Sequence, residues 1–152
     1  MTPLPHRYSV TSTSLPSEHV RLHEKGLPEL VSEPPVEFGG PGNLWSPETL
    51  LMAAVADCFA LTFRASAQIG RLAWEELNCV VDGVVNRVEG ITRFTEIHFR
   101  VFLTVGSESD IEKGRKIVEK TEKNCLVSNS LICTKTMEVT VETGETKKLR
   151  SA

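Results

Sequence analysis

Apolar residues are densest between positions 47 and 70, where they are spread around the whole circumference of a helix instead of forming one stripe. Ser46 has the side chain of a helix N-cap, Pro47 suits the first helical position, and Glu48 suits the positive end of the helix dipole. The pattern predicts a helix from Pro47 to Gly70 that is covered on most of its sides.

This run approaches the length of a membrane span, but it carries Asp57 and Arg64 well inside it. A buried helix of a soluble protein is therefore the favoured interpretation. Residues 1–8 contain no apolar segment of the kind that export signals have, so we expect a cytoplasmic protein.

Alternating apolar and polar positions predict strands before and after the long helix. The clearest alternation places Ile97, Phe99, Val101 and Leu103 on one face, with polar residues and Phe102 on the other. On the polar face, His98 is interpreted as a solvated strand residue. The expected strands are 7–13, 19–24, 29–32, 77–88, 92–105 and 134–143.

A second, amphipathic helix is expected from Asp110 to about Lys123, with Ser109 as its cap. Residues 124–131 should form a short turn, and residues 144–152 a loose tail. Together these elements predict an α+β fold, with the helices on one side of a mainly antiparallel sheet. We expect one domain over residues 1–152, with an ordered core at about 5–143.

The net charge of −3 and the absence of a basic stripe argue against nucleic acid or an anionic membrane as a partner. The four cysteines form no C-x-x-C motif, and no histidine lies near them at a metal-ligand spacing, so neither a zinc site nor another cofactor is expected. Cys79 and Cys133 are interpreted as small buried hydrophobic residues.

Cys58 and Cys125 are of greater interest, because each lies in an ordered, partly buried setting. Their surroundings read FGGPG at 38–42, SPETLL at 46–51, ADCF at 56–59 and CLVSNSL at 125–131. These separated motifs, in this order, resemble the OsmC/Ohr family of osmotically inducible and organic hydroperoxide resistance proteins. Leu126 replaces a proline that is common in the family, which points to an OsmC-like branch.

The resemblance implies an OsmC-like fold in an intertwined homodimer, and a thiol peroxidase that reduces organic hydroperoxides. By the same resemblance, Cys58 is the peroxidatic cysteine, Cys125 the resolving cysteine, Glu48 the acidic residue of the site and Arg21 its arginine. A thiol or dithiol reductant, such as a lipoylated protein, would complete the cycle.

Helix geometry limits how these residues can meet. Cys58 lies about three turns into its helix, beyond the reach of the helix dipole, so we expect a cationic side chain to supply most of the stabilisation of its thiolate. Arg64 is about 240° around the axis from Cys58 and points elsewhere. Glu48 is about 15 Å away along the same helix, so it could reach only the cysteine of a second subunit.

Two other functions remain open. A redox-sensing or small-molecule-binding dimer could keep the same pocket with little turnover. Alternatively, both cysteines could be core residues of a structural protein, which is the common role of a buried cysteine.

Overall fold

The computed structural model describes residues 3–150 of the chain. They fall into two compact units, divided between Leu51 and Met52. That the whole chain acts as one domain stays a prediction.

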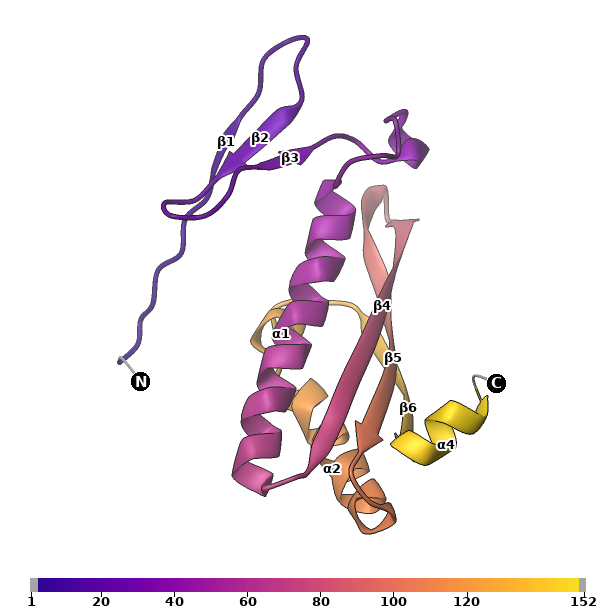
Figure 1. The fold of residues 1–152 in the computed structure, drawn as a ribbon. Helices are drawn as coiled ribbons and strands as arrows, with labels where there is room; N and C mark the ends of the chain where they lie inside the picture. Colours follow the sequence, from indigo (N-terminus) through magenta and orange to yellow (C-terminus); the bar gives the residue numbers. More distant parts are fainter. Residues whose placement is uncertain (1–2, 151–152) are drawn as a thin grey trace. The chain divides into compact units, whose positions relative to one another are not determined.

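The N-terminal unit contains a small antiparallel sheet with strand order β1-β2-β3 (Figure 1). Its strands are β1 (Thr11–Thr13), β2 (Val20–His23) and β3 (Leu30–Ser32), followed by the short helix η1 (Val36–Phe38). The three predicted strands are confirmed, although the first is shorter than expected.

The connection from η1 to the long helix is tightly folded. A Cβ atom at Gly40 would lie 1.6 Å from the carbonyl oxygen of Pro34, so only glycine fits there. The chain then passes beside β3, where the Glu33 N–H donates to the Trp45 carbonyl over 2.9 Å. These contacts fix the chain just before the helix begins.

Helix α1 (Pro47–Gly70) has the predicted bounds. Its start is fixed by reciprocal hydrogen bonds: the Thr49 N–H donates to Ser46 Oγ over 3.2 Å, and the Ser46 N–H donates to Thr49 Oγ1 over 2.9 Å. This is the arrangement of a capping box, with threonine in place of the usual glutamate. The predicted N-cap at Ser46 is confirmed.

The C-terminal unit contains a second sheet, with strand order β4-β5-β6. Strands β4 (Trp74–Val88) and β5 (Ile91–Val105) form a long hairpin, whose turn places Glu89 and Gly90 at φ 51° and 80°. Strand β6 (Thr134–Thr143) pairs with β5 in parallel, so the sheet is mixed. The helical connection between β5 and β6 returns the chain to the start of β5, which a short hairpin turn could not do.

Two helices cover the same face of this sheet. From α1, Phe59 packs on Phe99 of β5, with 5.6 Å between ring centroids. From α2 (Ile111–Asn124), Gly114 packs on Leu103 and Val105 of β5. The expected α+β architecture, with the two predicted helices on one side of the sheet, is confirmed (Figure 1).

Within one chain, α1 is covered along one face only, and not on most of its sides as the sequence suggested. Its buried residues are Val55, Phe59, Phe63 and Ala67. By contrast, Leu61 and Ile69 are 51% and 85% exposed. By length and composition alone α1 could cross a membrane, a criterion that core helices of soluble proteins also meet. Here α1 is the core helix of the C-terminal unit.

Two predicted details of the helix ends are wrong. Asp110 is the N-cap of α2, and Ser109 lies one residue earlier, in the short helix η2 (Glu108–Asp110). The expected loose tail is helix α4 (Gly144–Arg150), where Lys147 forms an ion pair with Glu76 of β4. This ion pair ties the helix to the sheet. Residues 151–152 of the predicted tail lie outside the described residues.

Candidate functional site

The fold of the C-terminal unit brings Cys58 and Cys125 together, although they are 67 residues apart in the sequence. Cys58 lies in the middle of α1 and is partly exposed, whereas Cys125 is fully buried. The Cys125 thiol lies against the Cys58 sulfur, as does the hydroxyl group of Thr62, one turn further along α1. All four cysteines of the chain are free thiols.

The local structure at Cys125 explains what else surrounds Cys58. Helix α2 ends at Asn124, Cys125 is extended at φ −70° and ψ 109°, and the short helix α3 (Leu126–Asn129) begins at the next residue. The first N–H groups of a helix have no partner within it. Here the N–H groups of Val127 and Leu126 are directed at the Cys58 sulfur.

The two sulfurs are shifted in opposite directions. Burial alone would raise the pKa of Cys58, but the Val127 N–H, the Cys125 thiol, the Thr62 hydroxyl and the Leu126 N–H outweigh it and lower this pKa. Burial raises the pKa of Cys125 to about 11, and the neighbouring Cys58 adds to this shift. In this pair, Cys58 therefore loses its proton more readily than Cys125.

That a cationic side chain supplies most of the stabilisation of the thiolate stays a prediction. The groups that lower the Cys58 pKa in the C-terminal unit are main-chain N–H groups, a hydroxyl group and a thiol. Arg64 is exposed on α1, as its position around the helix axis suggested. The sequence offered a signal for Thr62, which lies four residues after Cys58 and so on the same helix face. It offered none for the N–H groups.

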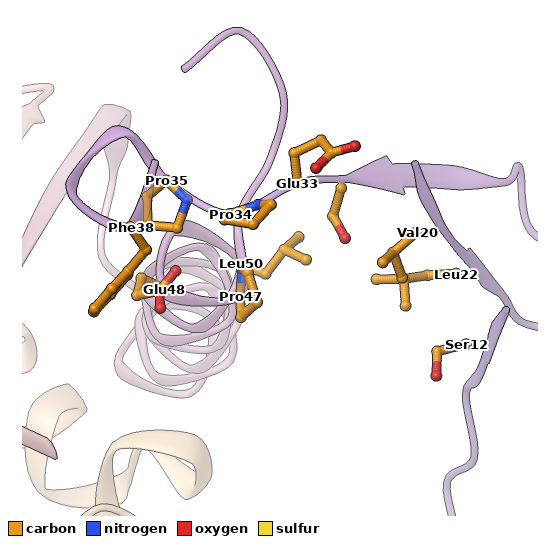
Figure 2. A pocket seen from close by; sticks show the side chains of 11 residues that line it. Ser12, Val20, Leu22, Glu33, Pro34, Pro35, Phe38, Pro47, Glu48 and Leu50 are labelled. Atoms are coloured by element: carbon orange, nitrogen blue, oxygen red, sulfur yellow. The ribbon is translucent and has the colours of Figure 1, made fainter. Parts of the chain in front are cut away.

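Glu48 belongs to the N-terminal unit, where it lines a largely apolar cavity of about 530 Å³ (Figure 2). Val20 and Leu22 of β2 line the same cavity, as do Pro47 and Leu50 at the start of α1. Glu48 Oε2 is buried, and no residue among 3–150 hydrogen-bonds to it. Such a carboxylate oxygen is available to a donor from outside the chain.

Arg21 lies between Val20 and Leu22 on β2, so its side chain is on the opposite face of the strand from the cavity. It is half exposed and forms ion pairs with Glu18 at 3.3 Å and Glu29 at 3.8 Å. The structure thus brings Cys58 and Cys125 together in one unit, and places Glu48 and Arg21 on different faces of the other. That Glu48 and Arg21 serve Cys58 stays a prediction.

The remaining cysteines also pack against the core of the C-terminal unit. Burial raises the pKa of Cys79 to about 11, and Cys125 adds to the shift. Cys133 lies directly before β6 and is partly exposed. Among residues 3–150, no three or more histidine, cysteine, aspartate or glutamate side chains are grouped so that they could hold a metal ion.

The structure thus shows an α+β fold in which a long helix carries one of two adjacent thiols. The family model described as OsmC-like protein matches residues 40–142. This chain belongs to that family, and the resemblance inferred from the sequence motifs is confirmed.

Individual relatives agree with this assignment. Over an alignment of 100 residues the chain is 28% identical to the uncharacterised protein YmaD of Bacillus subtilis (strain 168). This alignment covers 64% of this chain and 67% of YmaD. An OsmC-like protein of Vibrio cholerae O1 biovar eltor str. N16961 has a TM-score of 0.79 at 18% identity, covering 90% of this chain and 100% of its own.

An organic hydroperoxide resistance protein of Elizabethkingia anophelis has a TM-score of 0.72, also at 18% identity, covering 93% of this chain and 100% of its own. At this identity the two structural likenesses show the OsmC-like fold.

Proposed function

We propose that this protein is a thiol-dependent peroxidase that reduces organic hydroperoxides, with Cys58 as the peroxidatic and Cys125 as the resolving cysteine. The observation that carries the proposal is the contact between the two thiols, whose pKa values are shifted in opposite directions. Two-step thiol chemistry requires such a pair, in which one thiol ionises more readily than its partner.

In the first step, the Cys58 thiolate attacks the terminal oxygen of the hydroperoxide. An S–O bond forms and the O–O bond breaks, so that Cys58 becomes a sulfenic acid and the substrate leaves as an alcohol after taking up a proton. The N–H groups of Val127 and Leu126 hold the thiolate before the attack. Sulfur is oxidised by two electrons, and the peroxide is reduced by two.

In the second step, the sulfur of Cys125 attacks the Cys58 sulfenic acid. An S–S bond forms, the S–O bond breaks, and the hydroxyl group leaves as water with the Cys125 proton. Because Cys125 already lies against Cys58, no large movement of the chain is needed. A thiol or dithiol, for which a lipoylated protein in the cytoplasm is a suitable source, then reduces the disulfide.

We also propose that the active form is a homodimer. Leu61 and Ile69 of α1 are largely exposed in one chain, which is unusual for apolar residues of a core helix. A second copy that covers this face could also bring its Glu48 carboxylate toward Cys58, which the same helix cannot do. The apolar lining of the Glu48 cavity suits the organic group of a hydroperoxide. Sedimentation of the purified protein at several concentrations tests the dimer, and a monomer at all of them would contradict it.

The test of the peroxidase is turnover of cumene hydroperoxide with dihydrolipoamide as reductant. Cys58→Ser should abolish peroxide consumption, because the nucleophile is lost. Cys125→Ser should consume about one equivalent and then stop, with Cys58 found as sulfinic or sulfonic acid by mass spectrometry. Cys133→Ser, which changes a thiol outside the pair, should turn over normally. If Cys58→Ser kept the wild-type rate, the assignment would be wrong.

The position of Arg21 favours a second candidate function, a redox-sensing dimer with little turnover. Arg21 is held by Glu18 and Glu29 on the face of β2 away from the cavity, which leaves its part in catalysis unsupported. A disulfide that forms with hydroperoxide but is not turned over by dithiol would indicate the sensor. If Arg21 does assist the thiolate, Arg21→Ala should shift the pH profile of Cys58 alkylation upward.

A further inference from the structure

A third thiol, Cys79, lies on the inner face of β4, in register with Val101 of β5. Inward and outward positions alternate along this part of β4, and Leu77, Cys79 and Val81 are its inward residues. All three pack against the buried core of the C-terminal unit, and Cys125 is a member of that core. Cys79 thus faces the layer in which the redox pair lies.

Two contacts between α1 and β4 fix the level of this thiol relative to the helix. Phe63 packs on Trp74 with 5.2 Å between ring centroids. Met52 packs on Gly83, where a Cβ atom would lie 2.6 Å from the Met52 sulfur. Along α1, Cys58 is about midway between Met52 and Phe63. Along β4, Cys79 is about midway between Trp74 and Gly83. Cys58 and Cys79 therefore lie at the same level where α1 packs on β4.

The buried Cys125 belongs to the core against which both of the other thiols pack. It lies against Cys58, and after burial it is the second cause that raises the pKa of Cys79. These three thiols form a cluster in one core layer, with Cys58 on the partly exposed side, Cys125 buried against it and Cys79 on the sheet. Cys133, by contrast, packs against the core directly before β6.

From this cluster we infer that Cys79 is a second resolving thiol, which takes over the disulfide from Cys58. This inference rests on the proposed function, since a disulfide between Cys58 and Cys125 must form first. Cys79 loses its proton to solvent and its sulfur attacks the Cys125 sulfur. An S–S bond forms between Cys79 and Cys125, the bond between Cys125 and Cys58 breaks, and its electron pair leaves on Cys58 as a thiolate. The step involves no net oxidation or reduction.

The environment of the three sulfurs gives this exchange a direction. A thiol of lower pKa leaves faster from a disulfide, and a protein that stabilises one thiolate favours the state in which that sulfur is reduced. The N–H groups that lower the pKa of Cys58 thus make it the better leaving group. Burial raises the pKa of Cys79 to about 11, so the attacking thiolate is scarce at neutral pH and the exchange follows the first disulfide as a slower step.

The consequence is that the oxidised protein still carries Cys58 in its reduced form. A second molecule of hydroperoxide can then oxidise it, although Cys125 is already in a disulfide. The protein would respond to a first equivalent of peroxide by a reversible disulfide inside the core, and to an excess by oxidation of Cys58 to the sulfinic acid.

The test compares two variants by peptide mapping. Trypsin leaves Cys58 in peptide 26–64, Cys79 in 72–87 and Cys125 with Cys133 in 124–135, so both variants carry Cys133→Ser to make the linkages unambiguous. One variant has no other change, and the other adds Cys79→Val, which keeps an apolar side chain of similar size. Each is oxidised with one equivalent of cumene hydroperoxide, sampled over time, alkylated with iodoacetamide and digested without reduction.

With Cys79 present, we expect an early linkage of 26–64 to 124–135 that is replaced by a linkage of 72–87 to 124–135, while alkylation of Cys58 returns. With Cys79→Val, the first linkage should persist and Cys58 should lose its alkylation. Circular dichroism of this variant serves as the control that it is folded. If the first linkage is the final product in both variants, the inference is wrong.

Oxidation with diamide separates this inference from the proposed function. Diamide forms disulfides from neighbouring thiols without a sulfenic acid. If cumene hydroperoxide leaves all thiols reduced while diamide yields first the linkage of 26–64 to 124–135 and then, in its place, the linkage of 72–87 to 124–135, the peroxidase proposal fails and the exchange stands. If diamide yields only the linkage of 26–64 to 124–135, the exchange fails whatever the peroxide does.

Discussion

Replacing Thr62 by valine should make Cys58 a weaker nucleophile at neutral pH, because it removes one of the groups that stabilise the thiolate. A hydrogen bond to a charged group contributes about 1.5–3 kcal/mol when it is buried. Cys58 is partly exposed, so solvent should reduce this to about 0.5–1.5 kcal/mol. Since about 1.4 kcal/mol corresponds to a factor of ten, the thiolate fraction should fall about two- to tenfold.

The assay is the rate of alkylation of Cys58 by iodoacetamide as a function of pH, followed by mass spectrometry of peptide 26–64. In the Thr62→Val protein the rate should be lower at neutral pH and should converge with the wild-type rate at high pH, where both thiols are ionised. Thr62→Ser keeps the hydroxyl group and should resemble the wild type. Equal rates at neutral pH would refute the role of Thr62, and a difference that persists at high pH would show a change in access instead.

Three further predictions concern stability, each measured by urea unfolding. First, the free energy of unfolding should fall as the pH rises from about 9 toward about 11, because unfolded thiols ionise in this range while the folded Cys79 and Cys125 stay protonated. The expected fall is about 1–3 kcal/mol for each of the two thiols. Cys79→Val should remove about half of it. Second, Gly114→Ala should destabilise the protein by up to about 2 kcal/mol, because the new Cβ atom would lie 2.9 Å from Leu103 Cδ2 and this overpacking outweighs the gain in helix propensity. The difference in stability between Lys116→Ala and Lys116→Gly, at an exposed position of the same helix, measures the propensity alone. Third, Ser128→Ala should leave the stability unchanged or raise it by up to about 1 kcal/mol, because Ser128 Oγ is buried without a hydrogen-bond partner among residues 3–150. A loss of stability of more than about 1 kcal/mol would show that this hydroxyl group makes a stabilising hydrogen bond.

Local signals in the sequence predicted most of the elements, because each depends on nearby residues. The Ser46 cap, the alternation in β5 and the turn at Glu89 and Gly90 all lie within a few residues of the structure that they specify. The parallel pairing of β6 could not be read in this way, since alternation gives the faces of a strand but not its direction. Likewise, the tail became a helix through contacts such as that between Lys147 and Glu76, which are distant in the sequence.

For the site, the sequence identified the two thiols but not what surrounds them. The contact between Cys58 and Cys125 was expected only from the family resemblance, and the structure shows it. The stabilising N–H groups leave no trace in the side-chain pattern, since any residue other than proline at positions 126 and 127 would supply them. Cys79 looked like a core residue because, on its own strand, it is one, and its relation to Cys125 depends on how the sheet faces α1.

The break in the helix at Cys125 has two effects that belong together. It places the Cys125 thiol in the core, where burial raises its pKa, and by starting a new helix it frees the N–H groups that lower the pKa of Cys58. One feature of the main chain therefore separates the two pKa values, without a charged side chain in the C-terminal unit. A proline at position 126 would remove one of these N–H groups but keep that of Val127, which acts more strongly on Cys58. Leu126→Pro should consequently preserve the order of the two thiols, with Cys58 still alkylated before Cys125, and the reverse order would show that the N–H groups do not set it.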